Sequence, residues 1–317
     1  MPTARPSIVA SVRDRCLMAA HEMVAVLGRH RLQASRSALT DEIVADLRAE
    51  GVHVTSVDRL LGPAAAAACR EAIAAAGMLV ADRGTGPRVR WRRSSASIDL
   101  AHEELLARLP ALFLLGLDDA LLAVAEHYLR MPVAYHGAVL RHSPVDGRQV
   151  GPRRWHRDAE DFHVLRSVLY LNDVDEDGGP FEYLPRGLQG RASRALAADG
   201  MCSDDQLAAH VPRERWKRCI GPAGTLVIAD TAQVFHHESL QRRTPRSVVM
   251  MGHASRRPWH PALAQAHFPA HEHAAALARI VPADRRAHVF DWRQPDVARP
   301  EGTSESVSTI LGDALSG

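Results

Sequence analysis

The hydrophobic pattern of this 317-residue sequence changes near Met131. Before that point, apolar residues recur with the helical period, and Pro, Gly and capping residues bound the segments. After it, short runs rich in Val, Leu, Ile and Tyr are broken by Gly, Pro and Asp, as is typical of strands joined by tight turns. Helices followed by many short strands predict an antiparallel barrel or jelly roll with helices packed outside it.

No Gly/Ser-rich or Pro-rich linker divides the chain, so we predict a single domain over 1–317. It consists of a mainly helical lead-in at 1–130, a β core at 131–258 with a helical insert near 191–215, and a C-terminal segment at 259–317 whose polar tail, 301–317, is expected to be mobile. The predicted helices are 9–27, 40–51, 63–76, 101–109 and 119–129. The predicted strands are 133–142, 154–158, 164–171, 180–184, 225–229 and 246–253.

Composition excludes several classes of protein. The 39 basic and 37 acidic residues are interleaved and give a net charge of +2, without the clustered basic surplus of a nucleic-acid-binding protein. The longest apolar run, near 112–117, is far shorter than a membrane span, and no signal peptide is visible. The four cysteines lie far apart, as is typical of a reduced protein. We therefore expect a cytoplasmic protein without nucleic-acid or membrane partners, whose oligomeric state, monomer or homodimer, stays open.

The first candidate for chemistry is Trp155-His156-Arg157-Asp158. On a strand, residues i and i+2 point to one face, so His156 and Asp158 would present an imidazole and a carboxylate side by side. Such a pair is found by chance in a chain with 18 histidines, and alone it is more often a surface hydrogen bond than a metal site.

A second stretch, 230–237, ends in His236 and His237. One of these histidines could complete a set of two histidines and one carboxylate, which leaves three positions of an octahedral ion open and suits non-haem Fe(II) with oxygen. Arg246 follows at the start of the apolar run 247–251. A guanidinium at the start of a buried strand needs a negatively charged partner. This partner is either the carboxylate of a bound ligand or an Asp or Glu side chain of the protein itself.

These blocks resemble the phytanoyl-CoA dioxygenase-like (PhyH) branch of the Fe(II)/2-oxoglutarate-dependent oxygenases. The resemblance covers roughly 133–258 and depends on four blocks that occur in the family's order. They are Trp155-His156-Arg157-Asp158, the strand–turn–strand signature at 170–175 and 179–185, the distal-histidine block at 230–236, and Arg246 followed by Ser255-Arg256-Arg257-Pro258.

The resemblance implies a double-stranded β-helix, cupin-like in form, with the metal at its open end. Fe(II) would be bound by His156, Asp158 and His236. The enzyme would consume O2 and 2-oxoglutarate, release succinate and CO2, and by default hydroxylate a small organic molecule such as a secondary metabolite.

In the co-substrate pocket, the resemblance implies that Arg246 holds the C5 carboxylate of 2-oxoglutarate. Arg141 and Asn172, on neighbouring predicted strands, are further candidates for this pocket. The positions that in related proteins add a hydroxyl group are Ala159 and Glu238 in this chain.

The distal block departs from the family pattern, which usually reads His-x-Gly. This chain has His236-His237-Glu238, so both histidines are candidate ligands, and their spacing from Asp230-Thr231 favours His236. Asp158 argues against halogenation, because related halogenases replace this carboxylate with a small residue.

Several alternatives stay open from the sequence. The same iron site could serve desaturation, epimerisation or cyclisation. The chain could instead be a non-catalytic jelly-roll binding protein, or an isomerase or hydrolase that uses the three ligands without oxygen. The histidine-rich stretch with His260, His267, His271 and His273 is interpreted as a solvated loop or helix.

Overall fold

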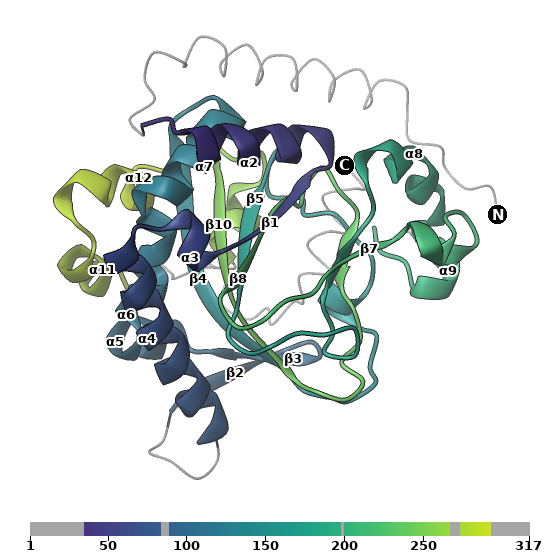
Figure 1. Cartoon of the computed structure of the whole chain (residues 1–317), viewed down its shortest axis with the longest axis horizontal. Helices are drawn as coiled ribbons and strands as arrows, with labels where there is room; N and C mark the ends of the chain where they lie inside the picture. Colours follow the sequence, from purple (N-terminus) through teal and green to yellow (C-terminus); the bar gives the residue numbers. More distant parts are fainter. Residues whose placement is uncertain (1–34, 84–88, 198–199, 267–272, 293–317) are drawn as a thin grey trace.

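The structure is a computed structural model that describes residues 35–83, 89–197, 200–266 and 273–292 (Figure 1). The helix predicted at 9–27, the histidines His267 and His271, and the tail at 301–317 lie outside the described residues.

A seven-stranded antiparallel sheet forms the centre of the fold, in the order β1-β8-β5-β10-β4-β3-β2. Its strands are β1 (Val52–Ser56), β2 (Trp91–Ser94), β3 (Ser97–Leu100), β4 (Val133–Ser143), β5 (Leu165–Tyr170), β8 (Thr225–Asp230) and β10 (Arg246–Ser255). A smaller antiparallel sheet has the order β7-β6-β9, with β6 (Phe181–Tyr183), β7 (Lys217–Cys219) and β9 (His236–Glu238).

The path of the chain makes these two sheets a double-stranded β-helix. Between β4 and β10 the chain crosses repeatedly from one sheet to the other. The strands β4, β5, β8 and β10 belong to the large sheet. In the small sheet, the bridged segment with Trp155 and His156 comes between β4 and β5, the strands β6 and β7 come between β5 and β8, and β9 comes between β8 and β10. His156 pairs with His236 and so extends the small sheet beside β9. The predicted fold class, an α+β jelly roll with supporting helices, is confirmed.

Alternate residues of the central strands face opposite layers, as the pleat requires. Leu140, Leu169 and Val249 belong to the core shared with the helices, whereas Val168 and Val248 belong to the core shared with the small sheet. Every residue of β4 is buried, because both of its faces are covered. This explains why these strands are almost continuously apolar in sequence.

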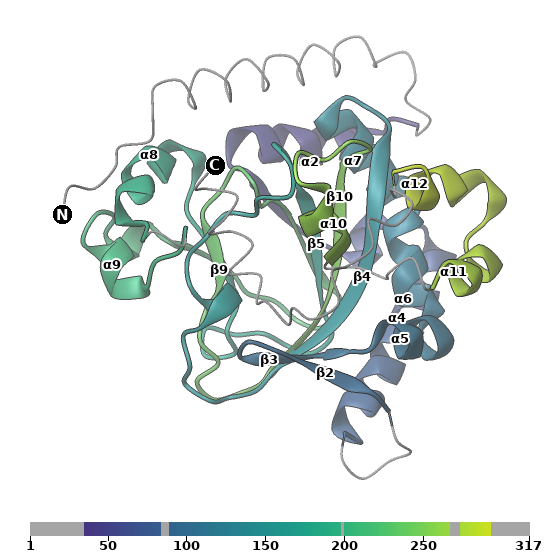
Figure 2. The ribbon, with the colours of Figure 1, turned by 180° about the vertical axis from the view of Figure 1, so that it is seen from behind.

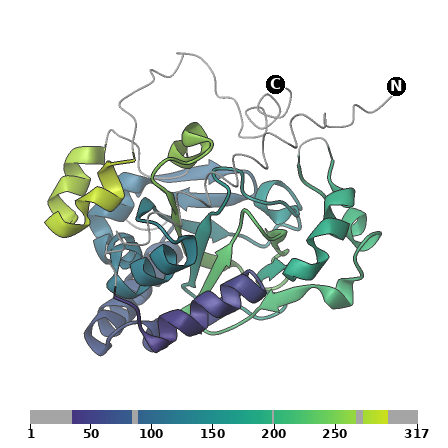
Figure 3. The same cartoon turned by 90° about the horizontal axis from the view of Figure 1, so that it is seen from above.

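Most of the longer helices lie on one side of the large sheet (Figures 1 and 3). The short helices between β6 and β7 lie on the opposite side of the β core, which Figure 2 shows from behind. The α-helices are α2 (Ala38–Ala49), α3 (Val57–Leu60), α4 (Pro63–Ala81), α5 (His102–Arg108), α6 (Pro110–Leu114), α7 (Asp119–Leu129), α8 (Gln189–Ala192), α9 (Asp204–Ala208), α10 (Pro261–Ala266), α11 (Ala274–Ile280) and α12 (Arg286–Phe290). Single 3-10 turns lie at Leu115–Leu117, Gly151–Arg153, Arg186–Leu188, Ser193–Ala195, Arg213–Arg215 and Ala283–Arg285.

Capping explains where the predicted helices begin. α7 begins as predicted, and the Asp118 carboxylate accepts a hydrogen bond from the backbone N–H of Ala120. α2 begins before the predicted Thr40, because the Ser37 hydroxyl caps the helix by accepting from the Thr40 N–H. α4 continues past Gly77 to Ala81, since a single glycine costs only about 1 kcal/mol in an alanine-rich helix.

Five of the six predicted strands are present as β4, β5, β6, β8 and β10. The prediction of a strand at 154–158 was wrong, because only Trp155 and His156 pair there, in isolated bridges, and Asp158 lies in irregular backbone. Three strands, β1, β2 and β3, come from the part of the chain in which only helices were predicted, and the three-residue strands β7 and β9 were not predicted either.

Among the described helices, only α4 is long and apolar enough, by length and composition, to cross a membrane, with 28% of its most apolar window buried. Its middle carries Arg70 and Glu71, and it packs on the helical core through residues such as Cys69 and Ile73.

We predict that Leu140→Ala costs about 2–5 kcal/mol in the free energy of unfolding, because Leu140 is fully buried on the face of β4 that packs against the helices. Val54→Ala should cost about 0.5 kcal/mol or less, because the Val54 side chain on β1 is 42% exposed. Urea denaturation of both variants measures these costs, and equal costs would contradict the proposed position of the core.

Candidate metal centre

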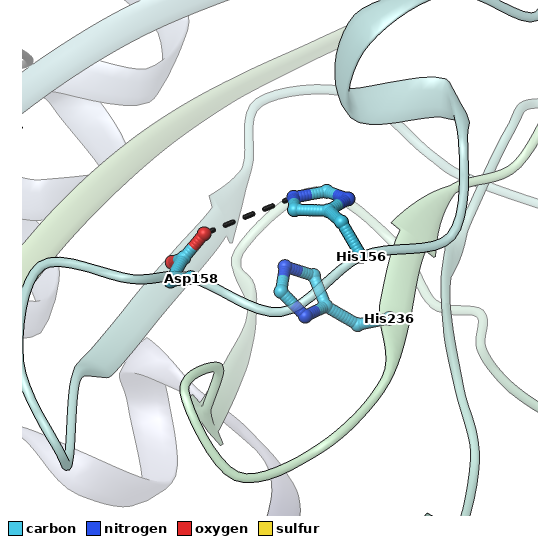
Figure 4. Close-up of side chains that lie close together, drawn as sticks. All are labelled: His156, Asp158 and His236. Atoms are coloured by element: carbon cyan, nitrogen blue, oxygen red, sulfur yellow. Dashed lines mark ion pairs between the residues drawn. The ribbon is translucent and has the colours of Figure 1, made fainter. Parts of the chain in front are cut away.

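The structure brings together the three side chains predicted to bind metal (Figure 4). The ligand atoms of His156, Asp158 and His236 all lie within 4.8 Å of one another. His156 Nε2 is 3.8 Å from Asp158 Oδ1, and the centres of the two imidazole rings are 4.4 Å apart. Two distant stretches of the chain therefore converge on one point.

Backbone pairing brings the two histidines together. The N–H of His156 donates to the carbonyl of His236 at 3.0 Å, and the N–H of His236 donates to the carbonyl of His156 at 3.0 Å. Directly opposed residues on paired strands hold their side chains about 5 Å apart on one face. The segment with His156 is itself anchored, because Trp155 is fully buried and its indole N–H donates to Asp204 in α9 at 2.9 Å.

Both histidines have the tautomer that a metal needs. Nδ1 of His156 lies 2.8 Å from the carbonyl of Arg154, and Nδ1 of His236 lies 3.1 Å from the carbonyl of Val234. Because a carbonyl can only accept, Nδ1 carries a hydrogen in each ring, and in the neutral form of the ring the lone pair is therefore on Nε2. Burial and the neighbouring His156 lower the pKa of His236 to about 3, so that its ring is neutral at neutral pH.

Two donors hold the carboxylate of Asp158. Its Oδ2 accepts from the Thr231 hydroxyl at 2.6 Å and from Arg166 Nε at 3.0 Å, and its backbone N–H donates to the Thr231 carbonyl at 3.0 Å. Burial raises the pKa of Asp158, but the Arg166 guanidinium and the hydrogen bond from Thr231 outweigh it and lower this pKa well below its usual range. The carboxylate is therefore ionised, with Oδ1 facing His156.

Sequence reasoning missed Arg166, Thr231 and Phe181. Arg166 is a charged residue inside the apolar strand β5, which is a signal that it has a buried partner. Thr231 follows β8 within the block already singled out. Phe181 stacks on the His236 ring with the ring centres 5.3 Å apart, and no pattern in the sequence around Phe181 indicates this contact.

His237 points away from the cluster. Its Nε2 lies 2.8 Å from Glu182 Oε2, its Nδ1 lies 3.1 Å from the carbonyl of Arg153, and its ring stacks on Trp155 at 4.0 Å. Because successive residues of a strand face opposite sides, only His236 faces the first pair of ligands.

Arg246 begins β10 and is almost fully buried. Its Nη2 lies 2.7 Å from Glu238 Oε2, while its buried Nε and Nη1 have no hydrogen-bond partner among the described residues. Burial raises the pKa of Glu238, but Arg246 outweighs it and lowers this pKa, so the pair is ionic.

The structure gives Arg141 and Asn172 other partners. Arg141 binds both oxygens of Asp99, at 2.7 and 2.9 Å. Asn172 donates to the carbonyl of Pro245 at 3.2 Å and accepts from the N–H of Ser247 at 2.7 Å, so that it ties the end of β5 to the start of β10.

A second group of side chains also lies close enough to share an ion. It consists of Glu42, Asp46 and His53 at the surface of α2 and β1. Arg59 already binds both oxygens of Glu42 at 2.7 Å, so this group has a sufficient structural explanation.

No family model and no curated protein matches this chain. Several solved structures are similar to it. They include EctD from S. alaskensis with bound Fe (18% identity, 72% of this chain and 80% of that chain, TM-score 0.48), the epimerase SnoN in complex with Fe3+, alpha ketoglutarate and nogalamycin RO (14%, 70% and 85%, 0.48) and the carbocyclase SnoK from nogalamycin biosynthesis (19%, 78% and 92%, 0.46).

We predict that His236→Ala weakens divalent metal binding more than about 100-fold, because a direct ligand is lost, whereas His237→Ala retains it. Titration of each variant with Mn(II), followed by electron paramagnetic resonance, measures this difference. Metal binding that survives in His236→Ala but is lost in His237→Ala would show that the other histidine is the ligand.

Thr231→Val removes the hydroxyl that binds Asp158 Oδ2 while keeping the shape of the side chain. We expect metal affinity to fall about 10-fold, since a less constrained carboxylate must be oriented on binding. The same titration tests this, and an unchanged affinity would mean that Arg166 alone fixes the carboxylate.

Proposed function

We propose that this protein is an Fe(II)/2-oxoglutarate-dependent oxygenase that hydroxylates a small organic molecule. The observation that carries this proposal is the convergence of His156, Asp158 and His236 within 4.8 Å, at the edge of a double-stranded β-helix. Two neutral imidazoles and one carboxylate are the donor set that suits non-haem Fe(II) with open positions.

The residues fit the metal in detail. The Nδ1 atoms of both histidines donate to backbone carbonyls, so that the neutral form of each ring has its lone pair on Nε2. Asp158 is held ionised by Arg166, and its second oxygen is engaged by Thr231. This preorganisation means that little side-chain entropy is lost when the ion binds.

Arg246 supports the assignment of a co-substrate carboxylate. It lies on β10, which begins eight residues after the end of β9, and two of its buried nitrogens lack partners among the described residues. Unpaired buried donors are costly, and an acceptor from a ligand would satisfy them. When bound, the iron and 2-oxoglutarate would supply the oxidising equivalents for attack on a carbon–hydrogen bond, with succinate and CO2 as co-products.

We also propose, from the sequence blocks, that the chain is a PhyH-like member of this class and that it acts in the cytoplasm without nucleic-acid or membrane partners. The balanced charge supports this, as do the buried thiols of Cys69 and Cys219. Desaturation, epimerisation and cyclisation are alternatives that would use the same residues.

The proposal predicts that 2-oxoglutarate, added anaerobically to the Fe(II)-loaded protein, produces a visible charge-transfer band, and that succinate forms once air is admitted. Asp158→Ala should produce neither, because it lacks one of the three metal ligands. Absence of the band in the metal-loaded wild type would favour a binding protein. Turnover with zinc and without 2-oxoglutarate would favour an isomerase or hydrolase.

A further inference from the structure

The arginine assigned to the co-substrate already holds a carboxylate of the chain itself. Glu238 and His236 are residues i+2 and i of β9, so their side chains leave the same face of the strand about 7 Å apart. From there the Glu238 carboxylate reaches Arg246 Nη2 at 2.7 Å. Glu238 therefore occupies part of the space in which the distal carboxylate of a 2-oxo acid would meet Arg246.

The charges around this pair are balanced without any ligand. Arg141 is bound by Asp99, Arg153 contacts Asp146, and Arg246 binds Glu238. All three guanidinium groups are buried. A further carboxylate would bring a negative charge next to that of Glu238, and in a buried site this repulsion is poorly screened.

Glu238 has a second cation within reach. Arg153 Nε lies 3.6 Å from Glu238 Oε1 and has no hydrogen-bond partner among the described residues. Gln241 also donates to Oε1, at 2.7 Å. A small rotation of Glu238 towards Arg153 would release the Nη2 of Arg246 to an incoming carboxylate.

We infer that Glu238 is a specificity-determining residue whose carboxylate competes with the distal carboxylate of a 2-oxo acid for Arg246. The inference rests on the proposed function. Its consequence is that the pocket distinguishes only weakly between 2-oxo diacids and 2-oxo acids that end in an uncharged group. An ion pair of merely structural importance would affect stability but would leave this discrimination unchanged.

The test compares two ligands of the same length, 2-oxoglutarate and 2-oxopentanoate, which lacks the distal carboxylate. Their dissociation constants are measured calorimetrically with the Mn(II)-loaded full chain, so that no turnover is needed. In the wild type we expect the two constants to differ by less than about tenfold, because the Nη2 of Arg246 is already paired with Glu238 and the two carboxylates would repel each other.

Glu238→Gln removes the charge and keeps the size of the side chain. We expect it to tighten 2-oxoglutarate binding by about tenfold or more, because the like-charge repulsion is lost, and to change 2-oxopentanoate binding by less than about threefold. The matched control is Glu182→Gln. Glu182 is an equally buried glutamate that binds His237 and Arg218 on the other face of β9, so this change should leave both constants unaltered.

The outcomes separate this inference from the proposed function. If the wild type prefers 2-oxoglutarate by more than about 100-fold, or if Glu238→Gln leaves its binding unchanged or weaker, the inference is overturned and the proposed function stands. If Mn(II) binds through His236 but neither wild type nor Glu238→Gln binds 2-oxoglutarate, the proposed function itself is overturned. Should Glu238→Gln not fold, the wild-type comparison alone decides.

Discussion

The candidate metal centre depends on one reciprocal pair of backbone hydrogen bonds, between His156 and His236. These two bonds join residues that lie far apart in the sequence and set their imidazoles on one face of the small sheet. The rest of the fold keeps this pairing in register: β6, which pairs with β9, packs on the large sheet through a shared apolar core, and the buried Trp155 anchors the other segment to α9. A slip of one residue would replace His236 with His237 and turn the ligand away.

The ligands are also held by charges from the large sheet. Arg166 of β5 and Thr231, which follows β8, fix Asp158, whose backbone is irregular and which no strand geometry orients. Arg246 of β10 and Glu238 of β9 form a second buried ion pair beyond His236. Buried pairs of this kind add little net stability, because the cost of removing two charges from water offsets their attraction.

Much of this organisation was predictable from the sequence. The apolar runs at 164–171, 225–229 and 246–253 predicted the buried strands β5, β8 and β10, and the order of the motif blocks predicted which side chains would meet. The interpretation of 154–158 as a strand correctly predicted that His156 and Asp158 lie close together. Strand geometry is not the cause, however, since Asp158 is placed by hydrogen bonds from Thr231 and Arg166. Short strands such as β9 leave no periodic signal, and the Glu238–Arg246 contact depends on tertiary packing that no local pattern encodes.

The central claim is that the Nε2 atoms of His156 and His236 and one oxygen of Asp158 bind a single ferrous ion. Anomalous diffraction at the iron edge, from anaerobic crystals of the Fe(II)-loaded protein, tests it most directly. The account predicts one peak at about 2.1 Å from both imidazole nitrogens, the usual metal–nitrogen distance. A peak beside His237 and Glu182, or full iron occupancy anywhere else in the chain, would contradict it.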